Sequence, residues 1–155
     1  MALTTQQLAF ELEQLQQGNC WIGNNAKEIL DGINWKMACF RAFEKGNSIW
    51  QITNHIAHWR EVVTRRITFV PLSEAEITGM DAPSLPSAEA WAKTLDRFQT
   101  SYEKLYAAIA AFPEDKLETT LSSGTYRSTI VGLIEHDAYH LGQIILLKRM
   151  AEAAG

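Results

Sequence analysis

Two histidines four residues apart, His136 and His140, lie in the last strongly apolar segment of the chain, STIVGLIEHDAYHLGQIILLKRM at 128–150. On a helix, positions i and i+4 share one face about 6 Å apart along the axis, so two imidazoles placed there can bind one metal ion. The other two histidines, His55 and His58, also share a segment, SIWQITNHIAHWREVVTRRITF at 48–69. This concentration has two explanations: a metal site, or histidines that hydrogen bond inside the core.

Helical geometry separates the four histidines by the face each one occupies. At 100° per residue, His136 lies about 40° from His140, which shares the apolar stripe of its segment. His55 lies about 60° from the middle of the other stripe and His58 about 120° away. We therefore expect His55, His136 and His140 to face the core and His58 to lie at its margin. The stripe residues are Ile52, Ile56, Trp59, Val63 and Val70 in the first segment and Leu133, Ile144 and Leu147 in the second.

Two familiar classes of metal site fit these residues poorly. HDAYH resembles the HExxH pattern of zinc peptidases, but Asp137 replaces the glutamate that serves as general base and is one methylene shorter. Di-iron bundles need Glu-x-x-His on two helices, whereas this chain offers only DAYH and HIAH. A site of three histidines, with positions left open for water, and satisfied core histidines both remain possible from spacing alone.

Four amphipathic helices are needed to position these residues. We expect a first helix from Thr5 to Gln17, and short helical turns over residues 19–47. A second helix starts with a capping box of Ser48 and Gln51 and runs to about Phe69. A fourth runs from about Thr129 to Ala151, with Ser128 as its N-cap.

The third helix has the clearest pattern, because its apolar residues are spaced alternately by four and three positions and Pro113 ends it. The proline-rich segment 71–87 predicts a long loop, and no alternating strand pattern is present. The expected fold is thus an all-α four-helix bundle forming a single domain over residues 1–155. The seam of the third helix consists of Trp91, Leu95, Phe98, Tyr102, Leu105, Ile109 and Phe112.

Composition limits the classes of function. The chain has 155 residues, 46% of them hydrophobic, and a net charge of −4, which gives no general attraction to nucleic acid. Neither a secretory signal nor an apolar run long enough to cross a membrane is visible. Cys20 and Cys39 fit no disulfide framework, so we expect small buried thiols in a cytoplasmic protein.

Three stretches resemble the DinB/YfiT-like metalloenzymes: GNSIWQITNHIAHWR at 46–60, IEHDAYHLGQI at 134–144 and the WIG…LDGI region at 21–33. The resemblance implies an up-down-down-up bundle with long crossover connections. It also implies one divalent metal held by His55, His136 and His140. Gln143 matches the glutamine that follows the last histidine in many members, in a structural or supporting role. His58 matches no ligand position, which makes it a residue of the rim or pocket.

The same resemblance implies a thiol S-transferase, using a low-molecular-weight thiol such as bacillithiol or mycothiol, or a hydrolase of a small-molecule substrate. Zinc or nickel suits three imidazoles, and iron or manganese is also compatible. A homodimer is a further family-level expectation. The alternative is a non-catalytic bundle whose metal site is structural or vestigial, serving as a stress or interaction module.

An open site and a closed site would differ in their fourth ligand. The first and third helices carry no histidine or cysteine, so a closed site would need a carboxylate from Glu11, Glu13, Asp96 or Glu103, which we expect at the surface. Arg60 and Arg127 are interpreted as solvated surface arginines. The sequence does not rank Asp137, Tyr139 or Gln143 as catalytic.

Overall fold

Four long helices make up most of the structure: α1 (Thr5–Gln17), α4 (Ile49–Ile67), α5 (Ala88–Ala110) and α6 (Tyr126–Ala154). The computed structural model describes residues 3–73 and 79–155. Two short helices, α2 (Ala26–Leu30) and α3 (Trp35–Ala38), lie between α1 and α4. The expected all-α bundle is therefore confirmed, including the short helical turns before the second long helix.

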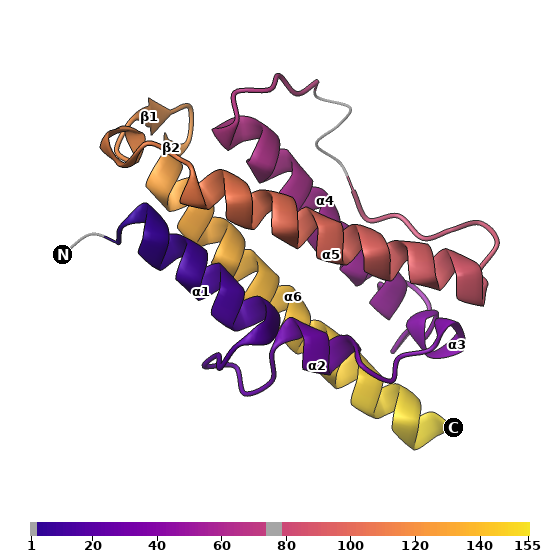
Figure 1. Ribbon diagram of the computed structural model, residues 1–155. Helices are drawn as coiled ribbons and strands as arrows, with labels where there is room; N and C mark the ends of the chain where they lie inside the picture. Colours follow the sequence, from indigo (N-terminus) through magenta and orange to yellow (C-terminus); the bar gives the residue numbers. More distant parts are fainter. Residues whose placement is uncertain (1–2, 74–78) are drawn as a thin grey trace.

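The long helices form an up-down-down-up bundle. Figure 1 shows α4 and α5 running in the same direction, and α1 and α6 running in the opposite direction. Both α1 and α4 pack against α5 and α6, so α1 and α4 face each other across the bundle. The parallel pair α4 and α5 requires the chain to return along the whole bundle after α4, which is why the connection before α5 is long. Since α4 and α6 are antiparallel neighbours, their two histidine segments can meet.

The N-terminal cap predicted for α4 is present, whereas the cap predicted for α6 is not. Ser48 and Gln51 form the expected capping box of α4. The expected N-cap of the last helix is wrong: Thr125 caps α6, and Ser128 is the partner that closes this capping box one turn into the helix. A short hairpin of β1 (Thr120–Leu121) and β2 (Gly124–Thr125) places Thr125 at the helix start, so α6 gains almost one turn.

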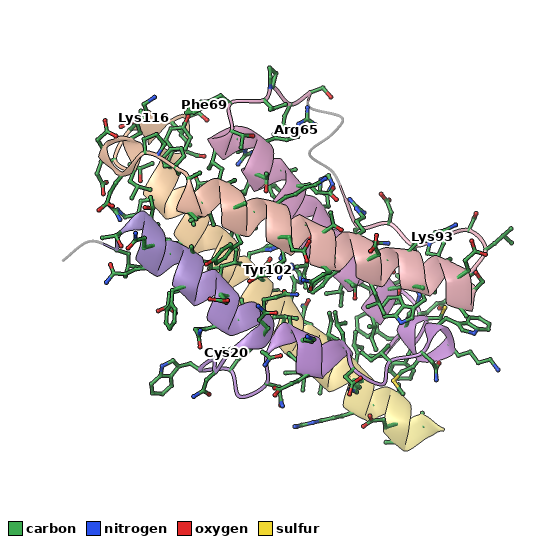
Figure 2. The ribbon with its side chains drawn as sticks, viewed as in Figure 1. Cys20, Arg65, Phe69, Lys93, Tyr102 and Lys116 are labelled. Atoms are coloured by element: carbon green, nitrogen blue, oxygen red, sulfur yellow. The ribbon has the colours of Figure 1, made fainter. Side chains whose placement is uncertain are left out.

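The end of α4 also differs from the prediction. The helix ends at Ile67, because Phe69 has a φ of 60°, in the left-handed region that side chains rarely adopt. The Phe69 ring stacks on Phe112. The ammonium group of Lys116, in the short 3-10 helix η2 (Glu114–Lys116), lies over the Phe69 ring at 5.4 Å from its centre. Figure 2 shows Phe69 and Lys116 together at this end of the bundle. Val70, predicted in the apolar stripe, is consequently exposed.

The core consists of two apolar clusters, one toward each end of the bundle, and the predicted seam of α5 contributes to both. Leu95 is partly buried and the other six seam residues are buried, as expected. Buried polar side chains occur as well, including Thr53, Arg60, Ser101 and Asp137. Such groups are stable in a core only when they are hydrogen bonded, so their hydrogen-bond partners indicate where the core contains a polar network.

Two further observations bear on the sequence predictions. Across residues 3–73 and 79–155, none of the helices combines the length and apolarity that a membrane crossing requires. Cys20 and Cys39 form no disulfide, and both are partly exposed rather than fully buried. Burial raises the pKa of the Cys39 thiol above its ordinary value, which keeps it protonated at neutral pH.

Candidate metal centre

Three imidazoles from two antiparallel helices meet at one point inside the bundle. His55 comes from α4, and His136 and His140 come from successive turns of α6. One ring nitrogen from each residue lies within 4.8 Å of the corresponding nitrogens of the other two. The Nε2 atoms of His55 and His136 are 3.1 Å apart. The structure thus brings together all three histidines that the sequence selected.

The outer nitrogens of His55 and His140 are both held by oxygen atoms. The Nδ1–H of His55 donates to the carbonyl of Gly79, and the Nδ1–H of His140 donates to Gln143 Oε1 at 2.7 Å. The amide of Gln143 in turn donates to the Tyr139 hydroxyl at 3.1 Å. Because an oxygen acceptor fixes the proton on Nδ1, the lone pair of Nε2 remains available on the inner side of each ring. Such partners are typical of metal-binding histidines.

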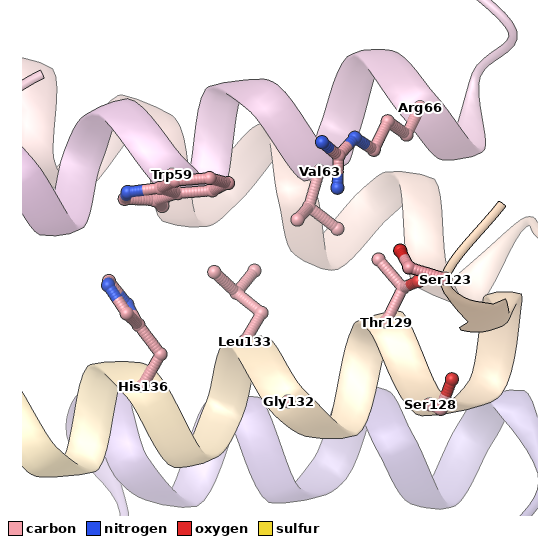
Figure 3. Close-up of a pocket in the computed structure, with 9 residues that line it drawn as sticks. All are labelled: Trp59, Val63, Arg66, Ser123, Ser128, Thr129, Gly132, Leu133 and His136. Atoms are coloured by element: carbon pink, nitrogen blue, oxygen red, sulfur yellow. The ribbon is translucent and has the colours of Figure 1, made fainter. Parts of the chain in front are cut away.

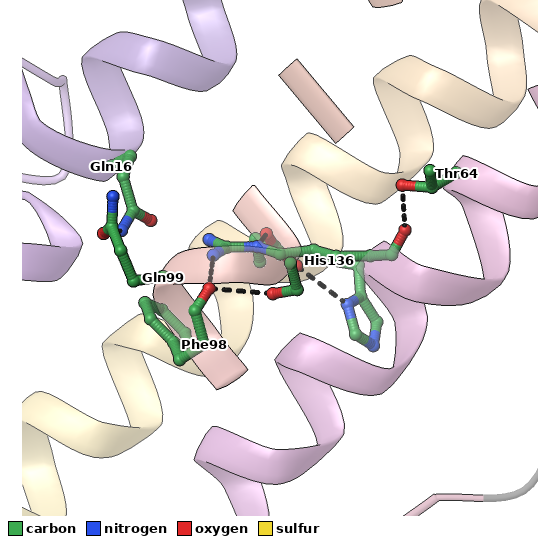
Figure 4. A network of polar contacts seen from close by, with 8 residues as sticks. Gln16, Thr64, Phe98, Gln99 and His136 are labelled. Carbon is green, nitrogen blue, oxygen red and sulfur yellow. Dashed lines mark hydrogen bonds and ion pairs between the residues drawn. The ribbon is translucent and has the colours of Figure 1, made fainter. Parts of the chain in front are cut away.

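The third ring, His136, is backed by a buried ion pair. Its Nδ1 lies 3.5 Å from Asp137 Oδ1, and Asp137 Oδ2 accepts a hydrogen bond of 2.6 Å from Arg60 Nε. The side chains of Arg60 and Asp137 are both 0% exposed. The guanidinium also lies 4.3 Å from the centre of the Phe98 ring and donates to the Phe98 carbonyl at 3.4 Å. Figure 4 shows this polar network crossing the middle of the bundle.

The burial of Arg60 overturns its interpretation as a solvated arginine. An unpaired charge would be strongly destabilised there, and the carboxylate of Asp137 on the neighbouring helix compensates it. Arg127 also differs from the prediction, because it lies at the hairpin and donates to Glu118 Oε1 at 2.5 Å. Only 19% of its side chain is exposed.

The inner nitrogens make a favourable site for a cation. If the Nδ1 atoms of His55 and His136 carry the protons, two Nε2 lone pairs face each other at 3.1 Å, which is repulsive unless a positive charge lies between them. A divalent metal removes this repulsion, and three convergent imidazoles are a donor set that zinc and nickel bind well. The residues present therefore fit a metal ion.

Burial also favours the neutral, metal-binding form of two of the rings. Loss of solvation lowers the pKa of His55 below its ordinary value of 6.5, and the hydrogen bond to Gly79 only partly opposes this. Loss of solvation likewise lowers the pKa of His140, against the opposing bond to Gln143. Both rings therefore keep a free nitrogen lone pair at neutral pH.

A loop anchors the His55 side of the cluster. The three consecutive carbonyls of residues 79–81 accept hydrogen bonds from His55, from Gln51 at 3.1 Å and from Asn54 at 2.8 Å. Three side chains from the first turns of α4 thus hold one short stretch of backbone. Sequence reasoning missed this role of Gln51 and Asn54, since the partner is a backbone segment whose position depends on the tertiary fold.

The fourth histidine, His58, lies apart from the cluster, as predicted. It packs beneath Gly79, where a Cβ atom would lie 2.5 Å from the His58 ring. Its Nε2 is buried and has no hydrogen-bond partner within the described part of the chain. The Trp59 ring lies near both groups, with its centre 6.2 Å from that of the His58 ring, 6.3 Å from that of His55 and 6.0 Å from that of His136.

A pocket of about 280 Å³ between α4 and α6 reaches the cluster at His136. Figure 3 shows Trp59 and His136 facing each other at one end, and Arg66, Ser123 and Thr129 at the other. His136 has 27% of its side chain exposed, so it is accessible from this pocket. The cluster is therefore connected to a space that could hold a small molecule.

No carboxylate or thiol joins the three imidazoles within residues 3–73 and 79–155. Glu11, Asp96 and Glu103 are exposed and Glu13 is partly exposed, as expected. Three protein ligands with accessible space beside them are typical of a catalytic metal site, whereas structural sites are closed by four.

Comparison with known proteins gives one match. The family model described as the DinB superfamily matches residues 22–144, which include all three clustered histidines, the Arg60–Asp137 pair and Gln143. No curated protein matches the chain, and no solved structure matches it.

Proposed function

Because the chain belongs to the DinB superfamily, we propose that it is a metal-dependent enzyme in which His55, His136 and His140 hold one divalent metal ion. The observation that carries the proposal is the set of three inward Nε2 atoms beside an accessible pocket, each backed by an oxygen acceptor at Nδ1. When bound, a zinc or nickel ion would supply Lewis acidity, which lowers the pKa of a thiol or water and polarises a carbonyl.

The chain's own residues have orienting roles in this proposal. Gly79, Asp137 and Gln143 fix the ring planes and the tautomers of the three histidines. Trp59 forms a wall beside His55 and His136 and keeps part of the pocket apolar. An apolar wall strengthens the electrostatic interactions made next to it.

A thiol S-transferase is favoured over a hydrolase by the residues that line the pocket. Among the described residues, those that line the pocket include no aspartate or glutamate, so they offer no carboxylate that could take a proton from water. A thiol has an ordinary pKa near 8.5, whereas that of water is 15.7, so a thiol needs much less assistance to lose its proton. We therefore propose that a low-molecular-weight thiol is the nucleophile and that a small electrophilic molecule is the substrate.

The test is thiol consumption by the metal-loaded protein in the presence of small electrophiles, compared with His140→Ala and His58→Ala. We expect turnover in the parent and in His58→Ala, and none above the uncatalysed rate in His140→Ala. Ester hydrolysis without thiol consumption would instead support the hydrolase. Neither reaction, in a protein that binds metal stoichiometrically, would favour the non-catalytic module.

A further inference from the structure

The pocket beside His136 has two chemically different ends. Trp59 and His136 form the end at the histidine cluster, and Arg66 and Ser123 lie at the far end, near the hairpin. Val63 and Leu133 lie between these ends and make the middle of the pocket apolar. The pocket therefore has a polar group at each end and an apolar section between them.

The length of the pocket follows from the helices that form it. Trp59 and Arg66 are seven residues apart on α4, and Thr129 and His136 are seven residues apart on α6. At 1.5 Å per residue each span is about 10 Å. A molecule that reaches from the histidine cluster to Arg66 must therefore be about 10 Å long, and a volume of about 280 Å³ restricts it to a slender chain or a small ring system.

Arg66 differs from the other arginines around this part of the bundle. Arg60, Arg97 and Arg127 each bind a carboxylate of the chain itself. Among the described residues, the Arg66 side chain has no hydrogen-bond or ion-pair partner, although it is only partly exposed and faces the pocket. A guanidinium in this position carries an uncompensated positive charge that an external anion can neutralise.

Most of the hydroxyl groups near Arg66 already donate a hydrogen bond within the chain, so few of them are available to such an anion. Thr129 Oγ1 and Ser128 Oγ both donate to the Thr125 carbonyl, at 2.9 Å each, and are therefore already used. Ser123 remains, on the hairpin turn next to Arg66 in Figure 3. One guanidinium and one hydroxyl match a carboxylate, which carries a single charge and accepts two parallel hydrogen bonds from arginine. A phosphate dianion would retain excess charge beside apolar walls.

We propose that Arg66 and Ser123 form a carboxylate-binding subsite that selects molecules carrying a carboxylate about 10 Å from the atom that reacts at the histidine cluster. This inference rests on the proposed function, since it specifies the substrate class of the same site. In this proposal Arg66 determines which substrates bind, and the histidine cluster is the place where the substrate reacts.

The test uses cobalt(II)-loaded protein and a series of unbranched thiols of increasing length, each ending in a carboxylate or in the matching amide. Binding is followed by the sulfur-to-cobalt charge-transfer absorption. At a length near 10 Å, we expect the acid to bind about 10- to 100-fold more tightly than the amide. Arg66→Gln should remove this preference for the acid without weakening the binding of the amide. Arg65→Gln is the matched control, because the Arg65 side chain donates to the Pro71 carbonyl and does not line the pocket.

Two results would overturn the subsite while leaving the metal site intact: equal binding of acids and amides at every length, or a preference that persists in Arg66→Gln. Failure of the protein to bind cobalt would instead contradict the proposed function. In that case, titration of the metal-free protein with octanoate and octanamide tests the subsite alone. The subsite is supported if octanoate shifts the Arg66 Nε–H resonance and octanamide does not. It is overturned if the two compounds have the same effect on this resonance.

Discussion

The buried pair of Arg60 and Asp137 gives the sharpest prediction about stability. Its two side chains are 0% exposed and are joined at 2.6 Å. Replacement of Arg60 by Met would leave the Asp137 carboxylate, among side-chain partners in the described part of the chain, with only the 3.5 Å contact to His136 Nδ1. A buried charge that loses its partner typically costs about 3–5 kcal/mol. We therefore expect Arg60→Met to lower the free energy of unfolding by about that amount, a large part of the total for a domain of this size.

The assay is urea denaturation of the metal-free protein, followed by circular dichroism. Arg97→Met is the matched control, because Arg97 of α5 also pairs with a carboxylate on a neighbouring helix, that of Glu61 on α4, but both of these side chains are 40% exposed. An ion pair that is this exposed is worth about 1 kcal/mol or less. If Arg60→Met costs no more than Arg97→Met, the account of a desolvated and uncompensated charge is wrong.

A double variant separates the fold from the site. Arg60→Met combined with Asp137→Leu removes both charges, so its stability should return to within about 1–2 kcal/mol of the parent. His136 would still lose its carboxylate partner, and metal affinity should remain about 10- to 100-fold weaker. A double variant that is as unstable as the single variant would show that the charge itself is not the cause.

Three further predictions follow from the same contacts. Gly79→Ala should weaken metal binding about tenfold, because the added Cβ would lie 2.5 Å from the His58 ring and displace the carbonyl that accepts the hydrogen bond of His55. Calorimetric metal titration checks this prediction. Addition of His58→Ala to this variant should restore the metal affinity. Burial lowers the pKa of both His55 and His140, so the unfolded chain binds more protons below pH 6.5. The stability of the metal-free protein should therefore be fully present above about pH 6.5 and decline as the pH falls toward the lowered pKa values, and urea midpoints that stay constant between pH 7 and 5 would contradict this. Thr125→Ala should cost about 1 kcal/mol in urea denaturation, because it removes the N-cap of α6.

The periodic patterns of the sequence predicted the elements that carry the site. The alternating spacing from Trp91 to Phe112 indicated α5, and the wheel positions of His55, His136 and His140 selected the three residues that converge. These features are local, because they depend only on which face of one helix a residue occupies. Their role as metal ligands stays a prediction.

The features that sequence reasoning missed depend on contacts between distant segments. Arg60 is buried only because Asp137, 77 residues later, lies beside it across the antiparallel pair of α4 and α6. The docking of residues 79–81 on Gln51 and Asn54 depends on where a long loop returns. The start of α6 was misplaced because Thr125 and Ser128 both suit an N-cap, and the hairpin decides between them.

The most direct test of the metal centre is the metal content of untagged protein purified without nickel resin, measured by mass spectrometry. The parent and His58→Ala should each contain about one equivalent of divalent metal, and His55→Ala, His136→Ala and His140→Ala should lose most of it while remaining helical. The contrary result is a parent that neither contains metal nor binds zinc or nickel on titration, or a His140→Ala variant with undiminished metal. Either would show that the imidazoles are hydrogen-bonded core residues and that the bundle has no three-histidine metal site.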